Sequence, residues 1–179
     1  LEQTLEYRVG ARGRFSESIA AMGHCPKARI ISYERATVTS AQAKVMWMED
    51  GEEVHRFETL RLVDGKPVTL ITHYLPVARC PGLEDAYRGG SLHAVLEDHY
   101  GIRLSRTQGL ISACLPEARE ASLLQYPRNR PLLKIRSNNR CLATGGLIEY
   151  SISRSRADCF EYRIEPQESS AKEGELRND

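Results

Sequence analysis

The segment Ile148–Asp158 alternates between apolar and polar side chains, which predicts a β-strand buried on one face. The apolar face would carry Ile148, Tyr150 and Ile152. The opposite face would carry Glu149, Ser151, Ser153 and Ser155. Solvated strand faces usually carry Lys, Thr or Glu, whereas a row of hydroxyls with one carboxylate suits the wall of a polar pocket. An ordinary solvated sheet face is the alternative that the spacing leaves open.

A second strong signal is Asp64-Gly65, which separates two apolar runs, Val54–Val63 and Val68–Leu75. This dipeptide predicts a tight β-hairpin, because glycine tolerates the positive φ that such a turn requires. The remaining runs of strand character are Ala28–Val38, Ile102–Leu115, Leu132–Cys141, Leu147–Arg156 and Phe160–Ile164.

Helical spacing of apolar residues predicts four short helices between these strands. They span Ser16–Met22, Ser40–Met48, Ser91–Tyr100 and Pro116–Leu124. The first three open on a serine, which is a favourable N-cap, and Gly101 would end the third. The expected fold class is α+β, a mostly antiparallel sheet of about six strands with inserted helices.

The 179 residues are enough for one domain. Residues 1–12 lack a stable period and are expected to be a linker, residues 13–165 the folded domain, and residues 166–179 a disordered polar tail. Because the chain starts at Leu1 rather than Met, we expect a further domain upstream of the linker.

Composition narrows the possible functions. A formal net charge of +1 gives no overall electrostatic case for nucleic-acid binding by this domain. The five scattered cysteines contain no C-x-x-C pair, and none of the five histidines has metal-ligand spacing. We therefore expect reduced thiols, a cytoplasmic location, no metal and no cofactor. The sequence has no apolar run of membrane-spanning length and no signal peptide.

Three places could bind an anion. Arg61 shares a strand face with Thr59 on an apolar strand, where an arginine needs either a partner or an anionic ligand unless it lies at the surface. Ser91 follows two glycines at a helix start, and is either a plain N-cap or part of an anion site. Ser16 is the third candidate.

Six short motifs in order carry a family resemblance. They are R-F-S-E at 14–17, T-L-R-L-V-D-G-K-P-V at 59–68, H-Y-L-P at 73–76, G-S-L-H at 90–93, G-I-R-L at 101–104 and E-Y-S-I-S at 149–153. Together they resemble the UTRA domain, the effector-binding half of HutC-type transcription regulators in the GntR family. Among these, the phosphonate-utilisation regulators are the most similar. The resemblance implies a chorismate-lyase-like fold, a homodimer, and an N-terminal winged helix-turn-helix domain that binds operator DNA.

The resemblance also implies a ligand site. Family members that sense sugar phosphates bind the phosphate at positions that correspond to Phe15, Ser16, Thr59, Arg61 and Ser91. Thr59 replaces one arginine of a pair, so one cation is lost. Ile71 stands where sugar sensors have a carboxylate, Ser155 where an aromatic residue is common, and His93 where tyrosine is common.

These departures argue against a sugar. They favour a small anionic effector, a phosphonate or phosphate ester, with Glu149, Tyr150, His73 and His93 selecting the rest of the molecule. The alternative is a chorismate-lyase-like enzyme in which Glu149 is the general acid or base.

Overall fold

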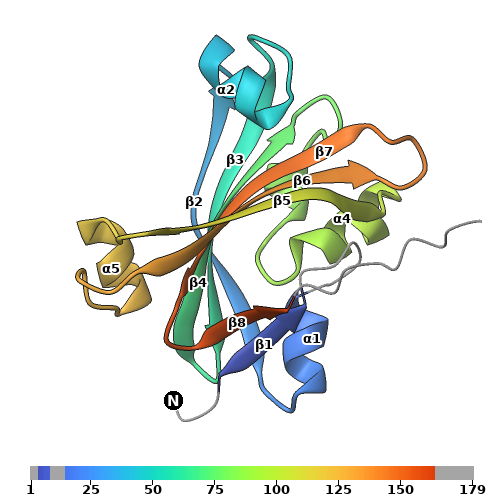
Figure 1. Cartoon of the computed structure of the whole chain (residues 1–179). Helices are drawn as coiled ribbons and strands as arrows, with labels where there is room; N and C mark the ends of the chain where they lie inside the picture. Colours follow the sequence, from blue (N-terminus) through green and yellow to red (C-terminus); the bar gives the residue numbers. More distant parts are fainter. Residues whose placement is uncertain (1–3, 9–14, 164–179) are drawn as a thin grey trace, which may run out of the picture.

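A computed structural model describes residues 4–8 and 15–163. Its centre is a six-stranded, fully antiparallel sheet with strand order β2-β3-β4-β7-β6-β5 (Figure 1). The strands are β2 (Pro26–Thr37), β3 (Glu53–Val63), β4 (Lys66–Pro76), β5 (Leu104–Cys114), β6 (Leu132–Cys141) and β7 (Leu147–Arg156). The predicted α+β class and six-stranded sheet are confirmed.

The hairpin between β3 and β4 forms as predicted. Asp64 and Gly65 have φ values of 51° and 78°, the left-handed conformation that a two-residue turn between twisted strands requires.

Short helices interrupt the strand sequence: α1 (Phe15–Ala21), α2 (Ser40–Met46), α3 (Leu83–Ala86), α4 (Leu92–Tyr100) and α5 (Ala118–Leu124). The one-turn helix α3 has no counterpart among the predicted elements, because four residues are too few to show a helical period.

The predicted helix ends are partly correct. Ser91 caps α4, and Gly101 ends it in the left-handed conformation, as expected. The N-cap of α2 is Thr39 rather than Ser40, because Thr39 forms a reciprocal capping box with Gln42. Ser16 lies within the first turn of α1 rather than at its cap.

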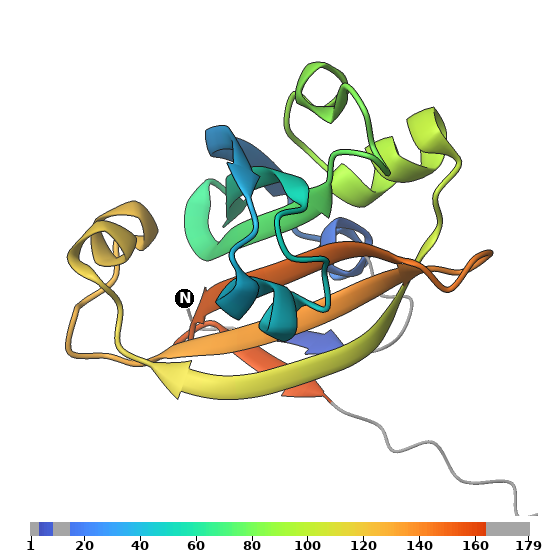
Figure 2. The same cartoon turned by 90° about the horizontal axis from the view of Figure 1, so that it is seen from above.

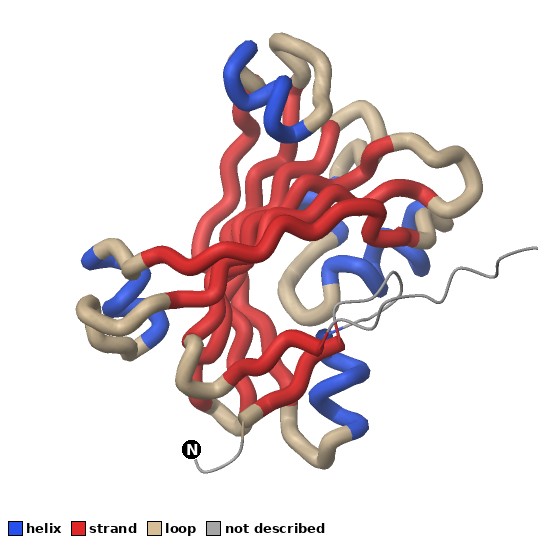
Figure 3. The backbone as a smooth tube through the Cα atoms, viewed as in Figure 1, coloured by secondary structure: helices blue, strands red, loops and turns tan. Residues whose placement is uncertain are grey.

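The sheet is strongly twisted: in Figure 3, β2–β4 and β5–β7 run in clearly different directions. Helices α3 and α4 lie together at one end of the molecule, as Figure 2 shows. They pack there through Leu83, Leu92 and Leu96 against Phe57 and Leu75 of the sheet. Burial of such side chains stabilises by about 1.5–3 kcal/mol each.

The other face of the hairpin is covered by α5. Leu124 of α5 belongs to one buried cluster with Leu60, Leu70 and Leu132. Because side chains alternate along a strand, this packing leaves Arg61 and its neighbours on the opposite face.

A second, two-stranded sheet joins the two ends of the described chain. Strand β1 (Leu5–Arg8) pairs in parallel with β8 (Phe160–Arg163). The expectation of an irregular linker is therefore wrong for Leu5–Arg8, and β8 does not extend the six-stranded sheet. The rest of the predicted linker before residue 13 lies largely outside the described residues, as does the predicted tail at 166–179.

Two bulges modify the strand alternation. Thr107 is the extra residue between β5 and β6, and Ile148 is the extra residue between β6 and β7. Ile148 therefore packs in the cluster that contains Leu92 and Leu96 of α4, and does not share a strict alternating face with Tyr150.

No helix in the described part of the chain is long and apolar enough to cross a membrane. The five cysteines are all free thiols.

Candidate functional site

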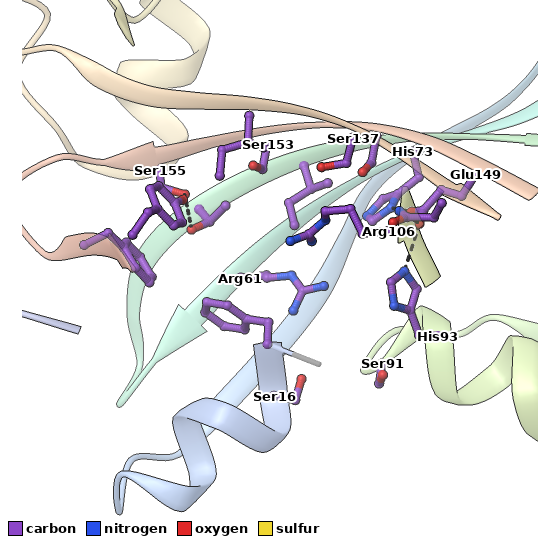
Figure 4. Close-up of a pocket in the computed structure, with 18 residues that line it drawn as sticks. Ser16, Arg61, His73, Ser91, His93, Arg106, Ser137, Glu149, Ser153 and Ser155 are labelled. Carbon is purple, nitrogen blue, oxygen red and sulfur yellow. Dashed lines mark hydrogen bonds and ion pairs between the residues drawn. The ribbon is translucent and has the colours of Figure 1, made fainter. Parts of the chain in front are cut away.

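A pocket opens between the inner face of the sheet, the start of α1 and the start of α4 (Figure 4). Its empty space, including the open mouth, is about 720 Å³. Strands β3 to β8 all contribute side chains, so the site depends on the whole fold. The lining residues are Phe15, Ser16, Arg61, Thr69, Ile71, His73, Ser91, His93, Arg106, Ile135, Ser137, Asn139, Glu149, Ser151, Ser153, Ser155, Phe160 and Tyr162.

The polar face predicted for β7 is a wall of this pocket. Glu149, Ser151, Ser153 and Ser155 all line it, which decides against an ordinary solvated face. The Ser155 hydroxyl is held in place, since it lies 2.9 Å from the Thr69 hydroxyl and accepts a 2.7 Å hydrogen bond from Tyr162.

The structure brings most of the predicted site residues together. Phe15, Ser16, Arg61, His73, Ser91, His93, Glu149 and Ser155 line the pocket. Thr59 and Tyr150 do not, for different reasons.

Thr59 is buried beside His73 and does not line the pocket. It is 1% exposed, and its hydroxyl is 2.9 Å from Nε2 of His73, so it positions the histidine. Tyr150 follows Glu149 on a strand and therefore points to the opposite face of the sheet. There its ring lies 6.2 Å from the ring of Tyr74.

Glu149 is the centre of a buried hydrogen-bond network. His73 Nδ1 donates to Oε1 at 2.5 Å, while Oε2 accepts from His93 Nε2 at 2.8 Å and from Asn139 Nδ2 at 2.6 Å. Glu149 is 1% exposed. Both carboxylate oxygens thus already accept hydrogen bonds. Figure 4 shows the side chain of His93 extending from α4 towards Glu149.

The charge state of this network follows from its surroundings. Burial by itself would raise the pKa of Glu149, but the charge of His93 and the hydrogen bonds from both histidines hold that pKa well below 4.5. Burial lowers the pKa of His73, against the opposing effect of Glu149, so its ring is neutral near pH 7. Neutral His73 then donates a hydrogen bond to Glu149 through Nδ1 and accepts one from the Thr59 hydroxyl at Nε2.

Arg61 supplies a cation to the middle of the pocket. Its guanidinium group lies over the ring of Phe15, 4.7 Å from the ring centroid. The hydroxyls of Ser16 and Ser91 approach the same region from α1 and α4 (Figure 4). Ser91 also accepts a hydrogen bond from the backbone N–H of Ala94, so its role as an N-cap is compatible with facing the pocket.

The glycines before Ser91 allow this approach. Gly89 has a φ of +114°, and a Cβ atom there would lie 3.2 Å from the carbonyl oxygen of Ala28. A residue with a side chain would strain the loop that brings Ser91 to the pocket.

Sequence reasoning missed several lining residues, among them the cation Arg106 and Asn139, which donates a hydrogen bond to Glu149. They are register partners on β5 and β6, next to the bulge at Thr107. Apolar and polar residues do not alternate regularly around Arg106, so the sequence pattern did not assign this arginine to the face of the sheet that lines the pocket.

In residues 4–8 and 15–163, no group of three or more His, Cys, Asp or Glu side chains is arranged to hold a metal ion. The histidines of the pocket instead hydrogen-bond Glu149.

The fold and this pocket define an effector-binding domain, and comparison with known proteins identifies the family. Residues 21–161 match the UTRA domain model, and the chain belongs to the UTRA family. It is the effector-binding domain of a GntR/HutC-type transcription regulator.

The curated relatives are transcription regulators. The chain is 32% identical over 166 residues to the probable transcriptional regulator PhnF of Escherichia coli (strain K12), covering 92% of this chain and 68% of that protein. It is 31% identical over 121 residues to the HTH-type transcriptional repressor PhnF of Mycolicibacterium smegmatis, covering 67% of this chain. It spans about half (49%) of that repressor's length.

A solved structure agrees with these relatives. The effector domain of PhnF from Mycobacterium smegmatis superposes with a TM-score of 0.80 and 27% identity, covering 90% of this chain and 99% of that one. The relatives are regulators and not enzymes, so the lyase alternative is set aside.

Proposed function

We propose that this domain senses a small anionic metabolite, a phosphonate or a phosphate ester. The observation that carries the proposal is the position of Arg61, whose guanidinium group enters the pocket that the hydroxyls of Ser16 and Ser91 also line, above both serines in Figure 4. A guanidinium fork surrounded by hydroxyl donors matches the oxygens of a phosphoryl or phosphonyl group.

The Glu149 network supports a ligand that is not a sugar. Sugar hydroxyls need acceptors, and both oxygens of Glu149 already accept from His73, His93 and Asn139. Ile71 adds an apolar side chain to the same wall. The names of the two PhnF relatives do not state an effector, and the choice of ligand rests on this geometry.

The domain would act within a cytoplasmic bacterial regulator. We propose that an N-terminal winged helix-turn-helix domain, preceding a linker, binds operator DNA. In support, the M. smegmatis relative is named an HTH-type repressor, and the present chain spans about half of it (49%).

We also propose that the domain forms a homodimer through β5. This strand is an edge of the sheet, and residues 107–113 are exposed and uncharged. The opposite edge, β2, carries Lys27, Arg29, Glu34 and Arg35, which discourage strand addition. A second copy pairing along β5 would satisfy its open backbone groups.

A ligand panel tests the sensing proposal. Inorganic phosphate, methylphosphonate and glucosamine 6-phosphate are each added to the chain in a thermal-shift assay. A ligand at 100 times its dissociation constant stabilises by about 2.7 kcal/mol, or about 5–10 °C for a domain of this size. We expect methylphosphonate to stabilise at lower concentration than the sugar phosphate.

Arg61→Gln should abolish the response, and Arg29→Gln, which removes an exposed arginine on β2, should leave it intact. An unchanged response in Arg61→Gln would place the anion site elsewhere. The absence of any response to phosphate or phosphonate in the unmodified chain would refute the proposed ligand class.

A further inference from the structure

Arg106 enters the effector pocket from the edge strand β5, on the side of the pocket that faces Arg61. Its Nε and Nη1 atoms are buried, and neither has a hydrogen-bond partner among the described residues. Buried polar groups in folded proteins are almost always hydrogen-bonded, since an unpaired one costs free energy and a buried charge costs more. This side chain therefore requires an explanation.

The local backbone directs Arg106 inward. The bulge at Thr107 leaves Arg106 opposite Asn139, the residue that donates to Glu149. A bulge at a sheet edge re-aims a side chain and is a common feature of binding sites. Residues 107–113 of the edge strand, which follow Arg106, are all exposed, so packing of that stretch does not explain why the arginine turns into the pocket.

Two guanidinium groups consequently face one space. In Figure 4, Arg61 and Arg106 point into the middle of the pocket from opposite walls, with Ser16 and Ser91 below them. Two guanidinium cations that face each other repel, and an anion bound between them would offset that repulsion. The nearby carboxylate, Glu149, is hydrogen-bonded to His73, His93 and Asn139 and is not hydrogen-bonded to Arg106.

We infer that Arg106 is the second cation of the anion site, and that the effector carries a doubly ionised phosphoryl or phosphonyl group held between Arg106 and Arg61. The inference rests on the proposed function and names its ligand class more narrowly. Arg106 would also supply, from strand β5, the positive charge that is missing from β3 because Thr59 stands in place of an arginine.

The chemistry of the two arginines selects for charge as well as shape. A phosphonate dianion offers three oxygens and two negative charges, enough for both guanidinium forks. A sulfonate has the same tetrahedral shape with one charge less. The pair methylphosphonate and methanesulfonate therefore separates the effect of charge from the effect of shape.

Isothermal titration calorimetry in alkaline buffer, where the phosphonate is a dianion, provides the test. The unmodified chain should bind methylphosphonate at least about tenfold more tightly than methanesulfonate. Arg106→Met should weaken methylphosphonate binding at least about tenfold and remove most of the difference between the two probes. Arg103→Met removes an arginine side chain that is 67% exposed and should change neither affinity.

The melting temperature of the ligand-free chain is a second readout. If the two buried, unpaired nitrogens of Arg106 are kept for an anion, Arg106→Met should raise this temperature while weakening the ligand response. An arginine with a merely structural role would instead lower the temperature when replaced. Arg103→Met should leave it within the error of the measurement.

The outcomes are distinguishable. If the unmodified chain binds neither methylphosphonate nor inorganic phosphate, the proposed function fails. If methylphosphonate binding depends on Arg61 but is unchanged in Arg106→Met, or if methanesulfonate binds as tightly as methylphosphonate, the proposed function stands and the two-arginine inference is overturned.

Discussion

Glu149 illustrates how far a single residue can be interpreted from sequence. The alternation along β7 left a pocket wall and a solvated face as alternatives, and Glu149 lines the pocket. The family resemblance assigned His73 and His93 to the same site. Their hydrogen bonds to Glu149, and the one from Asn139, could not be predicted, because the three partners come from three other elements. The sequence suggested a carboxylate that selects the ligand, whereas the geometry suggests one that fixes two imidazole rings around it.

A substitution at Glu149 should therefore reduce stability. Glu149→Gln replaces an acceptor by an amide group whose N–H atoms would face other donors. We expect a loss of about 2–4 kcal/mol in the free energy of unfolding at pH 7, measured by urea denaturation. Glu53→Gln makes the same chemical change at an exposed position and should cost less than about 0.5 kcal/mol.

The loss of unfolding free energy caused by Glu149→Gln should depend on pH with a definite sign. The pKa of Glu149 in the folded chain lies below the value of about 4.5 in the unfolded chain. The unfolded state therefore binds the proton first, so the stabilisation is complete above about pH 4.5 and is lost as the pH falls towards the folded pKa. A difference between Glu149→Gln and the unmodified chain that grows in acid would contradict this assignment.

At the scale of elements, short sequence patterns correctly predicted the turns and helix caps that neighbouring residues determine. The Asp64-Gly65 hairpin and the Ser91 cap of α4 follow from turn and capping chemistry, and both are present. Strand β1 and the bulges at Thr107 and Ile148 were missed because pairing with distant strands creates them. Arg106 was missed for the same reason, since its direction depends on a bulge.

The edge strand β5 makes a testable prediction about assembly. Leu110 is 47% exposed and is paired in register with Arg136, which does not line the pocket. Leu110→Lys places a charge in the proposed strand-to-strand interface, where like charges from two copies destabilise the pair. Sedimentation should show a dimer for the unmodified chain and mostly monomer for Leu110→Lys.

Val45→Lys is the matched control, since Val45 is 50% exposed and belongs to α2, not to the proposed interface strand. It should remain dimeric. A dimer that persists in Leu110→Lys, or an unmodified chain that sediments as a monomer, would rule out the proposed interface.

At the scale of the whole molecule, the pocket and the small sheet share residues. Phe160 and Tyr162 of β8 line the pocket, and β8 is paired with β1, the first described strand. A ligand can shift an equilibrium only by its difference in affinity for two arrangements, and about 1–3 kcal/mol is enough for a regulatory switch. The β1–β8 sheet is the element through which we expect the pocket to influence a preceding domain.

Hydrogen exchange can follow this coupling. Saturating methylphosphonate should slow amide exchange in Leu5–Arg8 and Phe160–Arg163, because ligand contacts hold β8 and thereby its pairing with β1. Exchange in α2, which lies at the other end of the molecule in Figure 1, should be unaffected. Protection confined to the pocket strands, with none in β1, would show that the small sheet does not respond.

The parallel direction of β1 and β8 also has a mechanical consequence. Leu5 is opposite Phe160 and Arg8 is opposite Arg163, so the chain before Leu5 and the chain after Arg163 leave from opposite ends of the pair. Tension between those two points would load the hydrogen bonds along the strands in shear, all together, instead of opening them one at a time. A pull on the chain before Leu5 would then be shared by the hydrogen bonds that join β1 to β8, the strand whose Phe160 and Tyr162 line the pocket.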